Sequence, residues 1–245
     1  MKNLVNNLSS VKDFLLNLIF PKECLGCGQE GRYLCQLCQS KILLNQKNYC
    51  AFCHKESSLS KICQLCQKES PLLNIWVAAD YNNEILQSLI HNLKYKYIEE
   101  SSQSLAGLII SYLEKNKIFS LLAINRSNAV MVPVPLHKKR YLERGFNQSF
   151  LLAKEISDFY KIEIGQLLRR RVNTISQVNL KRNERQANIQ NAFVFQEDKL
   201  IDKNKKIILI DDVITTGSTL NECAKVLAKS GFKEIYGLAI AQRDD

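Results

Sequence analysis

The stretch IILIDDVITTGSTL, residues 207–220, decides the fold of this chain. Its first four residues, Ile207 to Ile210, are branched and apolar, which is typical of a strand buried on both faces. The run ends in two adjacent carboxylates, Asp211 and Asp212, and continues into a loop of Thr, Gly and Ser. A buried strand followed by such a loop and a helix predicts a ligand site at the carboxyl end of a parallel sheet.

The chemistry of this loop favours a sugar phosphate. Backbone N–H groups at a helix start attract anions, and Gly217 lets the backbone approach a phosphate closely. Asp211 and Asp212 can accept hydrogen bonds from neighbouring sugar hydroxyls, so a ribose 5-phosphate fits both halves. The alternative is that the aspartates only cap a helix. The residues predicted to hold the phosphate are Val213, Thr215, Thr216, Gly217, Ser218 and Thr219.

Two other phosphate-binding classes are excluded by their missing motifs. The sequence has no G-x-x-x-x-G-K-[ST] for a P-loop nucleotidase, and no G-x-G-x-x-G after a strand for a dinucleotide fold.

Outward from this stretch, strands alternate with helices from about residue 72 onward. Because the strands are apolar on both faces, we expect an α/β domain over residues 71–245 with a parallel sheet flanked by helices. Strands are predicted at 74–81, 129–135, 205–212 and 234–242, and helices at 82–95, 102–116, 147–160 and 218–231.

Ahead of that domain, residues 21–70 contain four Cys-x-x-Cys pairs. Two such pairs supply the tetrahedral sulfur shell that structural zinc prefers, so the pattern predicts a double zinc ribbon with two closed Zn²⁺ sites. The segment has too few large apolar residues for its own core, so we expect chelation to unfold it and leave the rest folded. The predicted ligands are Cys24, Cys27, Cys35, Cys38, Cys50, Cys53, Cys63 and Cys66.

Alternatives remain open for these cysteines. A disulfide framework would suit a secreted chain, but no export signal is apparent. Sequential pairing closes the shorter loops and is preferred over an interleaved arrangement. His54 could replace a cysteine, although a surface position is favoured. The ninth cysteine, Cys223, shares a helix face with Leu220 and Leu227 and is interpreted as a buried core thiol.

Residues 1–20 have leucines and a valine at helical spacing and predict an N-terminal amphipathic helix. A signal peptide is the rival interpretation, but the apolar part is short and lacks a small-residue cleavage site. No apolar run reaches the roughly 20 residues of a transmembrane segment. Cytoplasmic localisation is therefore expected, which also suits reduced thiols.

The chain is basic, with a formal net charge of +10, which favours anionic partners. Residues 134–186 alone hold 12 Lys and Arg against 5 Asp and Glu. This charge suits nucleic acid and pyrophosphate equally well.

Residues 207–220 resemble the phosphoribosyl pyrophosphate (PRPP) motif of type I phosphoribosyltransferases. VPVPLHKKRYLERGFNQS, residues 132–149, resembles the signature of the ComF/GntX family, as do the positions from Arg169 to Phe193 and the cysteine-rich ribbon. The resemblance covers residues 21–242. It implies a type I phosphoribosyltransferase-like sheet, PRPP with Mg²⁺ as ligand, and pentosyl transfer to an unknown acceptor.

The resemblance also implies roles for individual residues. Asp211 and Asp212 would be catalytic, orienting the ribose and offsetting positive charge that develops on the ring during loss of pyrophosphate. A loop at residues 135–144 would bind pyrophosphate, and the stretch after Arg169 would close over the site or be a solvated basic connection. The implied pyrophosphate ligands are Lys138, Lys139, Arg140 and Arg144.

The acceptor half of the site is not readable from the sequence. Lys94 and Tyr95 either border the pocket or form a solvated helix end, which is the preferred interpretation, and His137 is expected to contact phosphate or solvent. A ComF-like protein is also expected to serve natural competence, with the competence machinery and single-stranded DNA as partners. The alternative function is thus a non-catalytic single-stranded DNA-binding protein on the same fold, and the oligomeric state stays open.

Overall fold

The computed structural model describes residues 21–46, 49–96, 98, 100–172 and 189–243. These residues belong to two compact units, Met1–Ile42 and Leu43–Asp245. The helix predicted for residues 1–20 and most of the predicted closing segment, residues 173–188, lie outside the described residues. Among the helices that are described, none is long and apolar enough to cross a bilayer.

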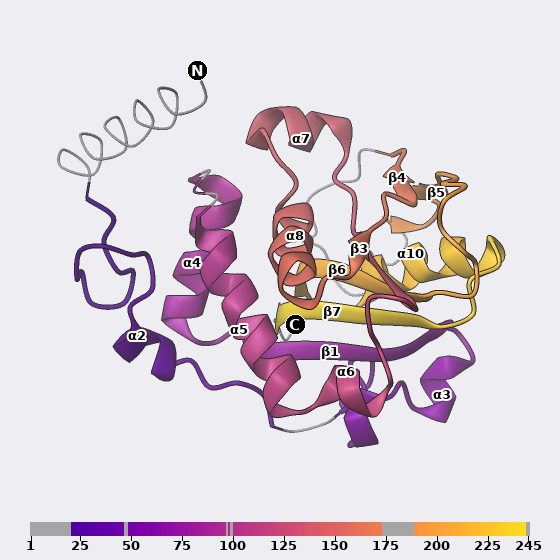
Figure 1. Cartoon of the computed structure of the whole chain (residues 1–245), viewed down its shortest axis with the longest axis horizontal. Coiled ribbons are helices and arrows are strands. Elements are labelled where there is room, and N and C mark those ends of the chain that lie inside the picture. The colour runs from indigo at the N-terminus through magenta and orange to yellow at the C-terminus, as the bar shows by residue number, and fades with distance from the viewer. Residues whose placement is uncertain (1–20, 47–48, 97, 99, 173–188, 244–245) are drawn as a thin grey trace. The chain divides into compact units, whose positions relative to one another are not determined.

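The larger unit is built on a five-stranded parallel sheet in the order β1-β7-β6-β2-β3 (Figure 1). The three central strands are almost completely buried, as expected for strands with apolar residues on both faces. The predicted parallel α/β architecture is therefore confirmed. The strands are β1 (Leu72–Asp80), β2 (Ala129–Pro133), β3 (Glu163–Ile164), β6 (Lys206–Ile214) and β7 (Ile235–Gln242).

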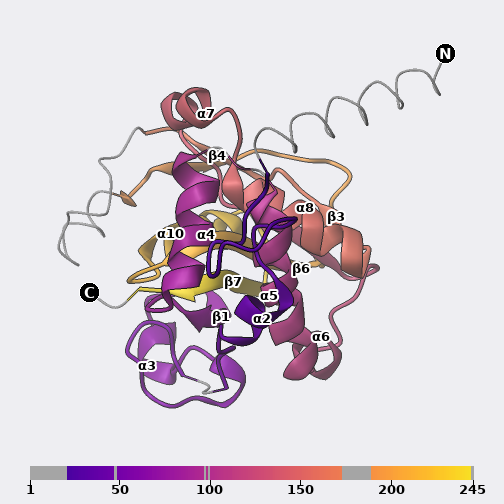
Figure 2. The ribbon, with the colours of Figure 1, turned by 90° about the vertical axis from the view of Figure 1, so that its left-hand side faces the viewer.

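Three long helices pack together on one face of this sheet (Figure 2). Helix α5 lies between α4 and α8 and contacts β1 and β7, while α8 contacts β6 and β2. Asparagine side chains cap two of these helices, because Asn83 accepts a hydrogen bond from Leu86 N and Asn147 accepts one from Ser149 N. The helices are α4 (Glu84–Tyr95), α5 (Ser101–Lys115) and α8 (Gln148–Tyr160), with the short α6 (Ile118–Leu121) after α5.

Helix α10 (Ser218–Lys229) contacts β6 and β7 and packs in a core that also takes in the second half of the cysteine-rich segment. Cys50, Ala51 and Ile62 are buried there in the same apolar cluster as Leu220 and Cys223 of α10. An antiparallel pair that the sequence patterns did not predict, β4 (Leu168–Arg170) with β5 (Phe193–Phe195), also contacts α10. The segment with the last two Cys-x-x-Cys pairs, Cys50 to Cys66, is called the second ribbon, and it contains η1 (Ser58–Ser60) and α3 (Gln64–Gln67).

The outer edge of β1, where the sheet ends, is covered by the chain that precedes this strand. Isolated antiparallel bridges join Leu44 to Ala79 and Lys61 to Asn74. Ile62 N donates to Leu73 O at 2.8 Å, so residues of the second ribbon satisfy backbone groups on the edge strand.

The smaller unit holds the first two cysteine pairs in residues 21–42. An antiparallel bridge between Glu23 and Glu30 closes the turn that contains Cys24 and Cys27, called here the first knuckle. Helix α2 (Gln36–Ser40) carries Cys38. The domain division predicted at residue 71 stays a prediction, although the compact units themselves divide after Ile42.

Candidate ligand pocket and metal centres

A pocket of about 410 Å³ opens at the carboxyl ends of the parallel strands. Asp211 and Asp212 at the end of β6 line it, together with Val134 after β2 and Arg243 after β7. The structure thus places the two aspartates where ligands bind in open parallel sheets.

Asp211 is buried beside a second carboxylate. Its Oδ1 accepts hydrogen bonds from Ser149 Oγ at 3.2 Å and from Asp212 N at 2.9 Å. Burial, with a smaller contribution from the charge of Asp212, raises the pKa of Asp211 to about 7. Asp211 therefore changes its charge near neutral pH, and its ionised form can accept hydrogen bonds from a ligand.

Asp212 forms an ion pair with helix α4. Lys94 Nζ lies 2.7 Å from Asp212 Oδ2, and both side chains are largely buried, at 18% and 6% exposed. The preferred expectation that Lys94 is a solvated helix end is wrong, because helix α4 turns it into the pocket. The helical spacing contained the signal, since Lys94 follows the buried Ile90 by four residues and both line the pocket.

The loop after β6 is divided between two cavities. Of the residues predicted to bind phosphate, Val213 in β6, Thr215 in the loop and Thr219 in α10 line the main pocket, and their binding of phosphate stays a prediction. Thr216 and Ser218 instead line a smaller cavity of about 170 Å³ beside the second cysteine cluster, and their hydroxyl oxygens are 2.6 Å apart. Between them, Gly217 has φ +72° and is the N-cap of α10, a conformation that favours glycine.

Only part of the predicted basic set reaches the pocket. Arg140 and Arg144 line it, whereas Lys138 and Lys139 are exposed and do not. The segment 135–144, predicted as a loop, contains helix α7 (Lys138–Arg144). The helix brings Arg140 and Arg144 to the pocket and leaves Lys138 and Lys139 exposed outside it. The Nδ1 atom of His137 accepts a hydrogen bond from Lys139 N and so caps this helix.

Sequence reasoning missed several further pocket residues, among them Arg170, Gln148, Tyr81 and Arg243. Arg170 on β4 brings a partly buried guanidinium to the pocket, 5.4 Å from the centre of the Phe193 ring. Gln148 lines the pocket with a buried Oε1 that has no hydrogen-bond partner among the described residues. Tyr81 and Arg243 form a cation–π pair at 5.8 Å. Gln148 lay inside the quoted segment 132–149 and Arg170 inside the stretch from Arg169 to Phe193, whereas Tyr81 and Arg243 had no local signal.

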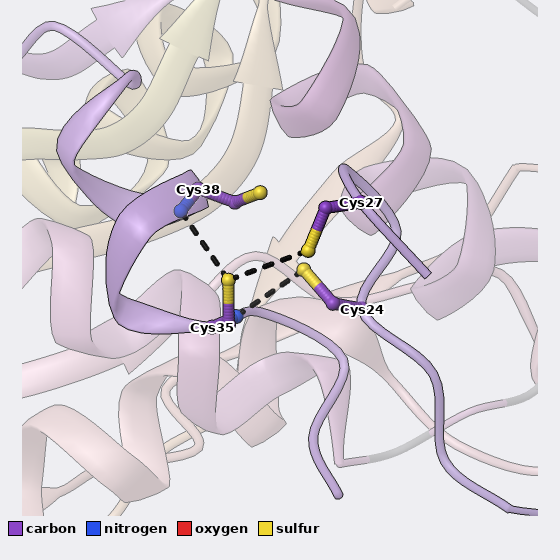
Figure 3. A group of neighbouring side chains, drawn as sticks. All are labelled: Cys24, Cys27, Cys35 and Cys38. Carbon is purple, nitrogen blue, oxygen red and sulfur yellow. Dashed lines mark hydrogen bonds between the residues drawn. The ribbon is translucent and has the colours of Figure 1, made fainter. Parts of the chain in front are cut away.

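The cysteines group sequentially, as preferred from their spacing. Cys24, Cys27, Cys35 and Cys38 form one cluster, in which all sulfur atoms lie within 4.8 Å of one another (Figure 3). The Sγ atoms of Cys27 and Cys35 are 3.6 Å apart. This separation is too long for a disulfide and close to the about 3.8 Å expected between two thiolates on one tetrahedral zinc ion.

The second cluster repeats this arrangement in the larger unit. It consists of Cys50, Cys53, Cys63 and Cys66, with Cys53 and Cys63 Sγ atoms also 3.6 Å apart. All nine cysteines lie among the described residues, and no disulfide joins any of them. The two groups of four cysteines fit two structural Zn²⁺ sites. His54 is exposed and stacks on Tyr49, and Cys223 is fully buried, both as predicted.

The thiols in each cluster are polarised unequally. Burial raises the pKa of Cys24, but backbone donors at Cys35, Gly26 and Cys27 outweigh it and lower that pKa to about 6. Burial and neighbouring sulfurs instead raise the pKa of Cys38 to about 12. A bound cation would allow all four thiols to ionise together, so the cluster can bind a metal ion through four thiolates.

Two families match this chain. A double zinc ribbon domain matches residues 15–70, and a phosphoribosyl transferase domain matches residues 148–243. Together with the parallel sheet, these matches confirm the predicted type I phosphoribosyltransferase-like fold preceded by a zinc ribbon.

Several known proteins are similar to this chain over most of their length. Competence protein F of Haemophilus influenzae is 33% identical over 212 residues, which cover 85% of this chain and 90% of that protein. DNA utilization protein YhgH of Escherichia coli is 29% identical over 220 residues, covering 81% and 92%. Competence protein ComFC of Bacillus subtilis is 27% identical over 204 residues, covering 81% and 79%.

Proposed function

This chain belongs to the ComF family, and on that premise we propose that it binds PRPP or a related ribose-5-phosphate ligand in the pocket at the end of β6. The observation that supports this proposal is that one pocket is lined by both carboxylates, by the hydroxyl groups of Thr215 and Thr219, and by lysine and arginine side chains. Asp211 and Asp212 would accept the ribose hydroxyls, while Thr215 and Thr219 would face the 5-phosphate.

The charge distribution of the pocket supports a pyrophosphate group. Guanidinium groups bind phosphates in a bidentate manner, and four of them, on Arg140, Arg144, Arg170 and Arg243, line the pocket. Lys94 neutralises one of two adjacent carboxylates, so Asp211 and Asp212 can both face one ligand. Mg²⁺ bound with the ligand would neutralise the leaving pyrophosphate and be held mostly by ligand oxygens and water.

If the protein transfers the ribosyl group, its own residues would act by position and charge. The paired carboxylates would stabilise positive charge that develops on the ribose ring, and the guanidiniums would stabilise the departing pyrophosphate. The acceptor is not identified by any described residue. The names of the relatives, which refer to competence and to DNA utilization, support a role in competence. The eight cysteines proposed to bind zinc need a reducing compartment such as the cytoplasm.

The decisive experiment is calorimetric titration of magnesium and PRPP into the zinc-loaded protein. We expect the Asp211→Asn/Asp212→Asn variant to bind on the order of 100-fold more weakly, because charge-assisted hydrogen bonds to the ribose are lost. Asp158→Asn is the matched control, since Asp158 is exposed on α8 and does not line the pocket. Equal affinity of all three proteins would refute the assignment of the aspartates.

A second candidate function is single-stranded DNA binding, and helix α7 favours it. Lys138, Lys139 and Tyr141 are exposed on this helix outside the main pocket, which suits phosphate contact and base stacking. Anisotropy of a labelled oligothymidine tests it across about 50 to 200 mM salt. We expect Lys138→Ala/Lys139→Ala to lower the slope of log affinity against log salt by about 1.4. The Asp211→Asn/Asp212→Asn variant should still bind DNA, and an unchanged slope in the lysine variant would contradict this candidate.

A further inference from the structure

The second cysteine cluster touches the phosphate loop through a glutamine at the end of β7. Gln242 is buried, and its Nε2 donates to Ala51 O and to Thr215 O, both at 3.0 Å. Ala51 lies inside the Cys50–Cys53 knuckle, and Thr215 belongs to the loop that lines the ligand pocket. One side chain thus joins the backbone of a metal knuckle to the backbone of the candidate phosphate loop.

A ring from the same knuckle packs against the other side of that loop. Phe52 lies between Ala51 and Cys53, and a Cβ atom at Gly217 would come within 2.8 Å of Phe52 Cε1. The ring edge therefore occupies the space that any side chain at Gly217 would need. Gly217 permits both the positive φ of the turn and this close approach.

The contact continues along the start of α10. Cys53 and Cys66 line the same small cavity as Thr216 and Ser218. Asn221 Nδ2 also lies 3.4 Å from Glu69 O, just after the last cysteine pair. The ribbon therefore packs directly against Gly217, reaches Thr215 through Gln242, and reaches the first turn of α10 through Asn221.

We propose that Phe52 and Gln242 are positioning residues that couple metal occupancy of the second cluster to the conformation of residues 213–219. Without zinc the Cys50–Cys53 knuckle loses the bonds that fix its shape, so Ala51 O and the Phe52 ring leave their places against the loop. Coupling is reciprocal, so a ligand that orders the loop must also stabilise zinc in the second cluster. The ligand-dependent half of this inference rests on the proposed function, whereas the loop-ordering half does not.

Zinc release tests the reciprocal effect in the full-length chain. Cys24→Ser/Cys27→Ser leaves only the second cluster able to hold zinc with four thiols, and Cys63→Ser/Cys66→Ser leaves only the first. We expect magnesium and PRPP to slow transfer of zinc to a colorimetric chelator on the order of tenfold in the first variant. The rate in the second variant should not change. Equal effects in both variants, or none in either although calorimetry shows that PRPP binds, would overturn the coupling.

Amide hydrogen exchange tests loop ordering without any ligand. We expect Phe52→Ala and Gln242→Leu, each shown by metal analysis to retain two zinc ions, to speed exchange in residues 213–219 on the order of tenfold. Exchange in α5 should stay unchanged, which separates the effect from global unfolding. Phe52→Leu, which keeps apolar volume, is the milder second variant and should fall between.

The two experiments separate the two proposals. If PRPP does not bind the wild type but the loop still loosens in Phe52→Ala, the proposed ligand is wrong and the positioning role stands. If the loop amides are unaffected by Phe52→Ala, by Gln242→Leu and by zinc removal, the positioning role is wrong whatever the ligand.

Discussion

The two cysteine clusters are nearly the same at the level of the metal site and different at the level of the fold. Each presents four thiols within 4.8 Å of one another, from two Cys-x-x-Cys knuckles. The first belongs to the compact unit Met1–Ile42, while the second is part of the core of the unit Leu43–Asp245. A knuckle motif thus specifies the geometry around an ion, and the residues beside the cysteines decide what the ion supports.

Those neighbouring residues explain the difference. In the second cluster, the knuckle contains Ala51 and Phe52, and Ile62 precedes Cys63, so apolar groups face β1 and α10. In the first cluster, Leu25 and Gly26 occupy the positions of Ala51 and Phe52, and no described residue of that cluster belongs to the apolar core of the larger unit. Loss of zinc should therefore have unequal consequences.

The largest expected effect is on the stability of the larger unit. We expect Cys63→Ser/Cys66→Ser to lower its free energy of unfolding by several kcal/mol. The upper limit of this loss is the apparent binding free energy of a structural zinc ion in small peptides, roughly 10–16 kcal/mol. Cys24→Ser/Cys27→Ser should leave that transition unchanged. Urea unfolding followed by fluorescence reads the larger unit alone, because the single tryptophan, Trp76, is buried in β1. Equal losses in both variants would remove the distinction between the clusters.

The effect of chelation differs from what the composition of residues 21–70 predicts. Chelation was expected to unfold residues 21–70 and leave the rest folded, but half of that segment shares a core with α10. The structure leads us to expect two events on chelation, one in each unit.

A pair of glycines offers the next largest contrast. Gly217 has φ +72° and its Cβ position is filled by the Phe52 ring, while Gly28 of the first knuckle has φ +75° and nothing within 4 Å. Gly217→Ala should cost about 2–5 kcal/mol from backbone strain plus overpacking, and Gly28→Ala about 1–2 kcal/mol from backbone strain alone. Thermal or urea unfolding measures both. Adding Phe52→Ala should relieve part of the Gly217→Ala cost, and a purely additive pair would show that the ring does not press on the loop.

The smallest expected effect is a dependence of ligand affinity on pH, measured while both cysteine clusters keep their zinc. Because the pKa of Asp211 is raised to about 7, this carboxyl is protonated below that pH and ionised above it. If the ionised form accepts the ribose hydroxyls, affinity for magnesium and PRPP should fall by up to about tenfold per pH unit as pH drops below 7. Calorimetry between about pH 6 and 8 measures this slope.

Asp211→Asn provides the control for that measurement. It should bind weakly with a flatter pH dependence, and the slope that remains belongs to the phosphates of the ligand. Metal analysis at each pH should show two zinc ions, since a loss of zinc in this range would attribute the weakening to the second cluster instead.

Local sequence was enough to predict what local sequence determines. The buried strand at residues 207–210 and the sequential grouping of eight cysteines follow from short-range patterns, and the structure has both. The strand continues to Ile214, however, so Asp211 and Asp212 lie within β6 and do not follow it. The resemblance to a family added Arg140 and Arg144, which do line the pocket. It also brought Lys138 and Lys139, which do not, because the segment is a helix and its residues point in different directions.

Contacts between distant segments were beyond the sequence. Lys94 resembles any charged residue near a helix end until α4 is packed on the sheet and its ammonium meets Asp212. Phe52 resembles an ordinary knuckle residue, and Gln242 an ordinary strand end, although they are 165 and 27 positions from the loop residues that they contact. Such pairs are set by tertiary packing, which hydrophobic periodicity does not encode.

The covered edge of β1 has a consequence for the behaviour of the protein in its metal-free form. Lys61, Ile62 and Leu44 shield backbone groups that would otherwise be open to another chain. An unshielded edge of a strand as apolar as Leu72–Ala79 is a template for intermolecular strand pairing. Zinc in the second ribbon would then protect the chain from self-association during its synthesis, a role in solubility that is independent of any ligand.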